Sequence, residues 1–369
     1  MKKVICLILM LLLGTTALAE TSGNQLGLNA LESLYDGTNN QMVSPISLAL
    51  ALSMAKDGAA GETRAEIVNA LGGEEDWTAV CETLEQNGLK IANAVFSASD
   101  LTIKDEYVQT LSQYAAEWFQ MDADVVEKVN AWTSEHTDGL IEKLIDQAPD
   151  DSVKLMLLNA VAMDAEWSVP FMQDATTEET FHAPAGDESV AMMHQTGYFE
   201  YAETEGAQLM RLHYRDSALT MLIALPKEGI DASEVLSALN EQGLNYFSGI
   251  TEEKYLAVSL PKVDFSADNT LNEVLKAAGI QTAFDENADF SGIADAPLFI
   301  NTVKQKARLV IDEAGTKAVS ATDICWTTSA LIVDAPIEFN ANRPFIALIA
   351  DEETGTICFA AVIANPANE

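Results

Sequence analysis

The sequence predicts an α+β protein, in which several helices come first and antiparallel strands dominate later. Three observations support this class. An apolar stretch follows a helix-start signal near residue 44, a continuous apolar run spans residues 155–163, and two apolar strands close the chain after residue 343. The 369 residues suggest two domains by length alone, but we find no linker, low-complexity segment or internal repeat that divides them.

The N-terminal residues predict a segment that is removed from the mature chain. Lys2 and Lys3 precede an apolar run at residues 4–13, and small residues lead to a cleavage position after Ala19. This order is typical of a bacterial secretory signal peptide, so we expect residues 1–19 to be cleaved and the rest to be secreted. The apolar run is too short to span a membrane.

The composition is strongly acidic, with 57 Asp and Glu residues against 20 Lys and Arg and a formal net charge of −37. Nucleic acids, anionic membranes and heparin-like polyanions all require basic patches on their protein partners. The charge therefore argues against these three classes of partner.

The cysteines do not predict a disulfide framework. Cys6 leaves with the signal peptide, and the remaining Cys81, Cys325 and Cys358 are odd in number and widely spaced. Cys358 lies in an apolar strand and is expected to be a small core residue. Cys325 falls in a predicted exposed loop, where a redox role and a plain surface thiol both stay open.

The first helices have recognisable starts. Ser44 is placed to cap a helix and Pro45 to occupy its first position, where a missing N–H is no loss. The helix that follows, at residues 46–55, is apolar nearly all round and is predicted to be buried. Thr63 and Glu66 have the spacing of a capping box, which predicts that they open the next helix.

Later elements follow from periodicity. Val129, Trp132 and His136 predict one packed helix face, and residues 155–163 predict a buried central strand that contains Asn159. Further predictions are strands at 190–201, 219–226 and 256–265, a helix at 272–278 stopped by Gly279, and a C-terminal hairpin of residues 343–350 and 356–366.

The most informative segment is residues 312–322, where Gly315 is followed by small and β-branched side chains. Alternate residues of a strand face the same way. An extended segment would put Thr316, Ala318, Ser320 and Thr322 on one face and Lys317, Val319, Ala321 and Asp323 on the other. The first face is entirely small and both charges lie on the second, which predicts burial of the first face. Gly315 would be the pivot, since glycine moves freely between a turn and an extended strand.

This segment resembles the hinge of the serpins, inhibitors that trap proteases by changing shape. Serpin-like motifs also occur in the family's order at residues 44–47, 129–139, 159–171 and 343–345, although Asp164 and Ala165 replace the family's usual Lys-Gly. The resemblance runs from about residue 28 to residue 366. It implies one large domain of serpin fold over residues 20–369, with a central, mostly antiparallel sheet and an exposed reactive loop at about 313–337.

The resemblance implies suicide inhibition of a serine protease, in which the cut loop inserts into the central sheet. The hinge would comprise Glu313, Gly315, Thr316, Ala318, Ser320 and Thr322. The family's spacing places the scissile bond between Ser329 and Ala330, within a range of residues 327–331. Trp326, Thr327, Thr328 and Leu331 would set specificity. The small residues favour elastase-like or subtilisin-like targets, cleavage after Trp326 by a chymotrypsin-like enzyme is the alternative register, and the lack of Lys and Arg at residues 318–342 argues against trypsin-like enzymes.

The resemblance also implies a polar cluster that controls the opening of the sheet, here Ser44, Ser47, Asn159 and Gln305. The family usually has histidine at the position of Gln305, and glutamine can hydrogen-bond but cannot titrate. Considered individually, Ser44 could equally be a helix cap without a gate role, and Asn159 a buried amide whose hydrogen bonds are satisfied.

Two other classes of function are possible for such a chain. The four histidines have no metal-binding spacing, and we find no Gly-x-Ser-x-Gly elbow or phosphate-binding glycine loop, so we expect no enzyme, metal or cofactor. A non-inhibitory serpin, acting as a carrier, storage or chaperone-like protein, is the alternative; such members typically have charged or bulky hinges. We expect a monomer whose partner is the target protease, held in a covalent complex.

Overall fold

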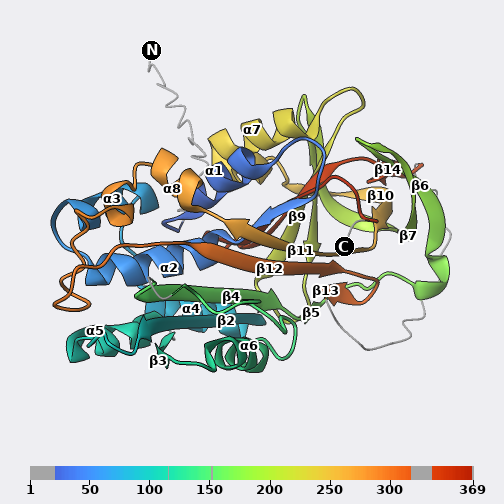
Figure 1. The fold of residues 1–369 in the computed structure, drawn as a ribbon. Coiled ribbons are helices and arrows are strands. Elements are labelled where there is room, and N and C mark those ends of the chain that lie inside the picture. Colours follow the sequence, from blue (N-terminus) through green and yellow to red (C-terminus); the bar gives the residue numbers. More distant parts are fainter. Residues whose placement is uncertain (1–20, 115, 151–152, 317–334, 368–369) are drawn as a thin grey trace, which may run out of the picture.

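The computed structural model describes residues 21–114, 116–150, 153–316 and 335–367. The helices are α1 (Asn24–Leu34), α2 (Pro45–Gly58), α3 (Gly61–Leu71), α4 (Trp77–Gln86), α5 (Asp105–Thr110), α6 (Val125–His136), α7 (Ala232–Gln242) and α8 (Asn272–Ala277). Single turns of 3₁₀ helix occur at η1 (Leu111–Tyr114), η2 (Gln173–Ala175), η3 (Gly243–Phe247) and η4 (Thr282–Phe284). Figure 1 shows these elements around two sheets.

The first sheet has nine strands in the order β1-β16-β15-β9-β8-β7-β10-β14, with β6 paired to β7. Its strands are β1 (Gln41–Val43), β6 (Thr177–Ala183), β7 (Gly186–Glu203), β8 (Ala207–His213), β9 (Leu219–Pro226), β10 (Glu252–Pro261), β14 (Ile337–Asn340), β15 (Phe345–Asp351) and β16 (Thr356–Ile363). All of its pairs are antiparallel except β10 with β14, so the predicted mostly antiparallel arrangement describes this sheet well.

The second sheet has five strands in the order β11-β12-β4-β2-β3 and is mixed. Its strands are β2 (Leu89–Ala98), β3 (Ala116–Met121), β4 (Leu155–Met163), β11 (Val263–Thr270) and β12 (Lys304–Ile311). The pairs β12–β4 and β2–β3 are parallel, which the prediction of a mostly antiparallel central sheet missed. Long connections join these partners, and such connections permit parallel pairing where a tight hairpin would not.

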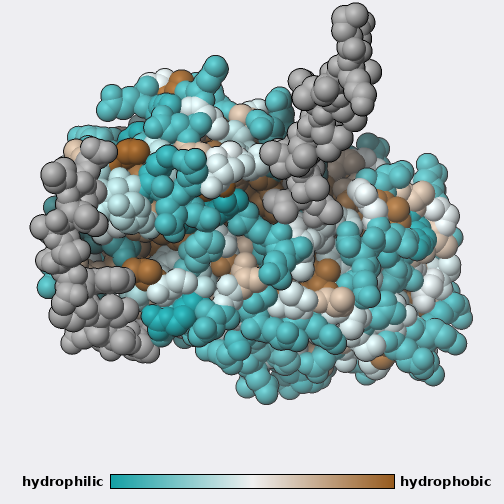
Figure 2. All heavy atoms as spheres, turned by 180° about the vertical axis from the view of Figure 1, so that it is seen from behind, coloured by the Kyte–Doolittle hydropathy of each residue, from teal (hydrophilic) through white to brown (hydrophobic). Residues whose placement is uncertain are grey.

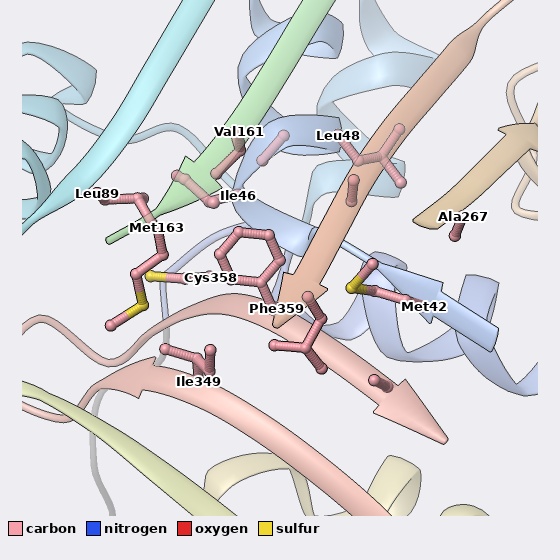
Figure 3. Packing of buried hydrophobic residues seen from close by; sticks show 14 of the residues in the cluster. Met42, Ile46, Leu48, Leu89, Val161, Met163, Ala267, Ile349, Cys358 and Phe359 are labelled. Carbon is pink, nitrogen blue, oxygen red and sulfur yellow. The ribbon is translucent and has the colours of Figure 1, made fainter. Parts of the chain in front are cut away.

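Helix α2 lies in the core between the two sheets, as its apolar sequence predicts. Ser44 caps the helix by accepting a hydrogen bond from the Ser47 N–H, and Pro45 is the first helical residue. Figure 3 shows side chains of α2, β4 and β16 meeting in this core, with the thiol of Cys358 among them. Cys358 is fully buried and free, which confirms its predicted place in the core.

Helices cover part of the outer face of each sheet. Helices α1 and α7 pack on the nine-stranded sheet, and α6 packs on the five-stranded sheet through Val129 and Trp132. His136, predicted on the same face, is only half-buried. No helix among the described residues is both long and apolar enough to cross a membrane. The exterior is mostly hydrophilic, with scattered apolar patches on the face in Figure 2.

The predicted capping box at Thr63 and Glu66 is wrong. Helix α3 already begins at Gly61, so both residues lie inside its first two turns. The Thr63 hydroxyl accepts a hydrogen bond from the Asp289 N–H, and the Glu66 carboxylate accepts from the backbone of Gln281 and Thr282. Both side chains serve contacts between distant segments rather than the helix end.

The predicted single strand at residues 256–265 is two strands in two different sheets. β10 ends at Pro261 in the nine-stranded sheet, and β11 begins at Val263 in the five-stranded sheet. Between them, the Lys262 N–H donates to the Ala191 carbonyl at 2.8 Å. The predictions for the strand at 219–226, for the helix stopped by Gly279 and for the C-terminal hairpin are confirmed within a few residues.

Candidate functional site

The chain makes a tight turn where it leaves β12. The Asp312 carboxylate accepts hydrogen bonds from the N–H groups of Ala314 and Gly315, at 2.8 and 3.1 Å. The Asp312 N–H in turn donates to the Gly315 carbonyl at 3.0 Å. The next two residues form a short strand, β13 (Gly315–Thr316), which pairs antiparallel with β5 (Ala165–Glu166) just beyond the end of β4.

Gly315 is required at this point by close packing. A Cβ atom here would lie 2.1 Å from the Ala165 carbonyl oxygen and 2.7 Å from the Glu166 Cα atom. Its backbone is not left-handed, since it is absent from the positive-φ glycines of the described chain. Glycine is therefore needed at position 315 for steric reasons, in addition to the conformational freedom that the sequence analysis expected.

Thr316 is buried, with 2 % of its surface exposed. Its hydroxyl lies 2.7 Å from the Tyr214 hydroxyl, and the Tyr214 ring stacks on Trp167 with 4.6 Å between ring centroids. The Trp167 indole N–H donates to the Asp312 carbonyl at 2.9 Å. Burial raises the pKa of Tyr214, so its phenol stays protonated and able to donate.

Glu313 fixes the turn to the nine-stranded sheet. Its carboxylate lies 2.7 Å from the Lys262 ammonium and accepts a hydrogen bond from the Thr176 hydroxyl at 2.8 Å. The Glu313 carbonyl accepts from the Phe171 N–H. Burial alone would raise the pKa of Glu313, but the hydrogen bonds from Lys262 and Thr176 outweigh it and lower the pKa below its usual value.

The four residues predicted as a gate lie together beneath the five-stranded sheet, and all are buried. Gln305 of β12 accepts from the Ser44 N–H and donates to the Ser44 carbonyl, both at 2.8 Å. The Ser47 hydroxyl donates to the Asn159 side chain on β4. The chain of hydrogen bonds thus joins β12 to β4 through the start of α2.

Two further residues extend this chain and were missed from the sequence. The Asn159 amide donates to Asn93 on β2, and the Asn93 amide donates to the Tyr114 carbonyl at 2.6 Å. Asn93 is fully buried in an apolar strand. The serpin resemblance identified Asn159, which is also the one amide in its apolar run. Asn93 is likewise the one amide in its apolar strand, and this is the signal that could have identified it.

The contact between β12 and β4 is short. Only Lys306 with Ala160 and Ala307 with Val161 pair across it. A cavity of about 450 Å³ opens beside the first residues of both strands, at the end away from Gly315, and the loop before β4 also lines it. We call this contact and its flanking cavity the β12–β4 seam. Its lining includes Leu144, Ile145, Leu155, Leu157, Asp268 and Lys304.

The other predicted site residues lie outside the described part of the chain, at residues 317–334. They are Ala318, Ser320, Thr322, Cys325, Trp326, Thr327, Thr328, Ser329, Ala330 and Leu331. Among the described residues, no group of three or more His, Cys, Asp or Glu side chains could hold a metal ion.

Comparisons with known proteins agree with this architecture. A family model described as "Serpin (serine protease inhibitor)" matches residues 21–366. An uncharacterized serpin-like protein of Thermococcus kodakarensis is 35% identical over 93% of this chain and 84% of its own length. A protein of Cyanea capillata named "Serine protease inhibitor" is 29% identical over 95% of this chain and 99% of its own. The native-state crystal structure of tengpin, a thermophilic serpin, superposes with a TM-score of 0.85 at 27% identity, covering 93% of each chain.

Proposed function

The chain belongs to the serpin family, and on that premise we propose that it is a secreted suicide inhibitor of serine proteases with elastase-like or subtilisin-like specificity. One observation carries this proposal furthest. Gly315 and Thr316 already lie as the first two residues of a new strand, against β5 at the end of the β12–β4 seam. The residues that follow need only continue in the same direction to enter the sheet.

The topology supports insertion at the β12–β4 seam. β12 and β4 run parallel, so a segment that turns back after Asp312 would run antiparallel to both. It would separate only two register pairs and would gain hydrogen bonds along both of its edges. Thr316 to Ser329 is 14 residues, about 46 Å when extended at roughly 3.3 Å each. The nine residues of β4 span about 30 Å on the same scale, so the segment is long enough to cross the sheet.

The chemistry would be that of an ordinary acyl transfer interrupted midway. The protease serine attacks the Ser329 carbonyl, the bond to Ala330 breaks, and the amine of Ala330 leaves with a proton. The product is an ester between the protease and Ser329. Water would normally hydrolyse this ester, but insertion of the segment that begins at Thr316 removes the protease first and distorts its catalytic geometry.

Small residues at 327–330 support proteases with shallow primary pockets as the target class, since a pocket shaped for a bulky or a basic side chain would be left unfilled. We also propose that residues 1–19 are removed on export and that the mature monomer, residues 20–369, acts outside the cell. The family generally consists of protease inhibitors rather than enzymes.

The proposal is tested by incubating the mature chain with pancreatic elastase and with subtilisin. We expect a complex that survives boiling in detergent, and a released C-terminal peptide whose mass places its first residue at Ala330, within the range 327–331. Clean cleavage with no stable complex would contradict inhibition and would favour the carrier, storage or chaperone-like alternative.

A further inference from the structure

A polar cavity of about 330 Å³ lies at the edge of the nine-stranded sheet, beside β14 (Figure 1). Its lining comes from the ends of β7 and β9, the start of β8, β14 itself and the turn that leads from β14 to β15. Every residue that lines it has a polar or charged side chain. An apolar ligand would leave these groups without partners, so the cavity suits a ligand that forms hydrogen bonds and ion pairs.

Arg343 is anchored in the wall of this cavity but leaves part of its guanidinium unused. Its Nε–H donates to the Pro226 carbonyl at 2.8 Å, and Nη1 donates to the Asn340 carbonyl and the Asn342 side-chain oxygen at 3.2 and 3.3 Å. Nη2 forms no hydrogen bond, and the guanidinium no ion pair, with any residue that the structure describes. This is so although Asp and Glu outnumber Lys and Arg by 57 to 20 in the chain. An anchored guanidinium with free N–H groups is well suited to bind a carboxylate.

The charge of Arg343 is only partly compensated by the protein. Burial lowers the pKa of Arg343, and the nearby Glu228 carboxylate opposes this effect without cancelling it. A ligand carboxylate at Nη2 would supply the missing negative charge close to the guanidinium.

Asn340 adds an acceptor without a donor. Its Oδ1 atom is buried and forms no hydrogen bond with any residue in the described part of the chain. Such an atom is costly to leave unpaired. Rotation of this amide would turn the oxygen into the cavity, where a hydrogen-bond donor of a ligand would satisfy it.

The remaining charges of the cavity determine what accompanies the ligand carboxylate. Lys227 and Glu203 neutralise each other, with 2.7 Å between ammonium and carboxylate. Glu228 and Glu338 are exposed, and neither forms an ion pair with a residue that the structure describes. Two such carboxylates beside one guanidinium would repel a simple anion such as phosphate and would attract an ammonium group.

We propose that this cavity binds a small polar zwitterion of the α-amino-acid type. The ligand carboxylate accepts hydrogen bonds from Nη2 of Arg343, and the ligand ammonium lies toward Glu228 and Glu338. A polar side chain of the ligand donates to the Asn340 amide. The site goes beyond the proposed inhibition, because none of the residues that line the cavity belongs to the proposed reactive loop.

The test measures binding of L-glutamine to the mature chain by saturation-transfer NMR. We expect a dissociation constant of about 1 mM, which is ordinary for a ligand of about ten non-hydrogen atoms. N-acetyl-L-glutamine lacks the ammonium and L-glutamine amide lacks the carboxylate. Each analogue should bind at least about tenfold more weakly, because each leaves one charged side of the cavity without its partner.

Two variants locate the ligand in the cavity. Arg343→Gln should weaken the binding of L-glutamine at least about tenfold, and Glu228→Gln, at an exposed position, should weaken it about threefold. Lys306→Gln is the matched control, because Lys306 also lacks an ion pair among the described residues but lies on β12 in the other sheet. It should leave the affinity unchanged, and thermal melts check that each variant is folded.

Three results would overturn the zwitterion site. They are no binding of L-glutamine up to about 20 mM, roughly twentyfold above the expected constant, equally tight binding of either analogue, and unchanged affinity in Glu228→Gln. The analogues and Glu228→Gln decide the matter even if Arg343→Gln, which loses backbone hydrogen bonds, fails to fold. Because no protease takes part, failure of the inhibition assay leaves this test intact, and failure of this test leaves the proposed inhibition intact.

Discussion

The two ends of the β12–β4 seam differ in how firmly they are held. At the hinge end, Gly315 and Thr316 are already paired with β5, and the Lys262–Glu313 ion pair and the Tyr214 hydroxyl tie the turn down. At the far end, a cavity of about 450 Å³ opens beside the first residues of both strands. Insertion as proposed would begin where β13 is already paired with β5 and would end beside the cavity.

Between the two ends, the buried chain from Gln305 to Asn93 links the strands from below. The strands that the proposal requires to separate are therefore linked by side-chain hydrogen bonds as well as by their own two register pairs. If the loop inserts as proposed, the uncut molecule stops short of its most stable arrangement. Four changes test this comparison.

Cleavage of the loop should have the largest effect on stability, because it would allow the segment that follows Thr316 to insert along the β12–β4 seam. If about ten backbone hydrogen bonds form at a net 1 kcal/mol each, the melting temperature should rise by roughly 10–15 °C for a chain of this size. Calorimetry of the chain before and after brief elastase treatment measures this change, with inactivated elastase as the control. An unchanged melting temperature would mean that the open end stays open after cleavage.

Thr316→Arg should block the hinge end. The guanidinium would have to enter the buried site beside Tyr214 and Trp167, at a cost of several kcal/mol without a matched anion. We expect the ester between protease and inhibitor to be hydrolysed before the loop inserts. The yield of detergent-stable complex should then fall at least about tenfold while loop cleavage continues. Thr316→Ser, which keeps the hydroxyl near Tyr214, is the matched control. Undiminished complex in the arginine variant would contradict burial of this residue during inhibition.

Asn159→Ala should weaken the link beneath the sheet. It leaves Ser47 and Asn93 without their shared partner, and a buried group without a hydrogen bond costs about 1–3 kcal/mol. We expect the free energy of unfolding to fall by about 2–4 kcal/mol in urea titration. Asn287→Ala, at an exposed loop position, is the control. If the chain acts as one unit, Ser47→Ala should add little to the Asn159 variant, and simple additivity would argue against it.

Local signals in the sequence predicted the buried helix α2, its cap and the central strand β4, because burial and capping leave marks on adjacent residues. The four gate residues were predicted from family motifs, and the structure brings them together. The capping box predicted at Thr63 and Glu66 is wrong because their hydrogen-bond partners lie more than two hundred residues away, and a local spacing rule cannot identify such partners.

The division of residues 256–265 into β10 and β11 had a signal in the sequence. Buried positions alternate as Leu256, Val258 and Leu260, and then shift by one to Val263 and Phe265. A one-residue shift turns the side chains to the opposite face of a sheet. Such a shift therefore marks a change of sheet. The steric requirement at Gly315 had no such signal, since it depends on a backbone that is distant in sequence.

Glu313→Gln should have the smallest effect on the free energy of unfolding, and its dependence on pH tests whether charge holds the hinge end of the β12–β4 seam. The carboxylate is stabilised in the folded chain, so its pKa lies below the ordinary value of 4.5. Its contribution to folding is therefore complete above about pH 4.5 and is lost as the pH falls through the lowered folded value. Because Lys262 is 41% exposed, we expect glutamine to cost only about 1 kcal/mol at pH 7.

The difference between wild type and Glu313→Gln should therefore be constant from pH 8 to pH 5 and shrink below it, as measured by urea unfolding at each pH. Glu286→Gln, an exposed carboxylate without an ion pair among the described residues, should show no such difference. A Glu313→Gln cost that persists undiminished at pH 3 would show that the turn is held by packing around Gly315 and Thr316 rather than by charge. In that case the hinge end would be held mainly by the close packing that leaves no room for a side chain at Gly315.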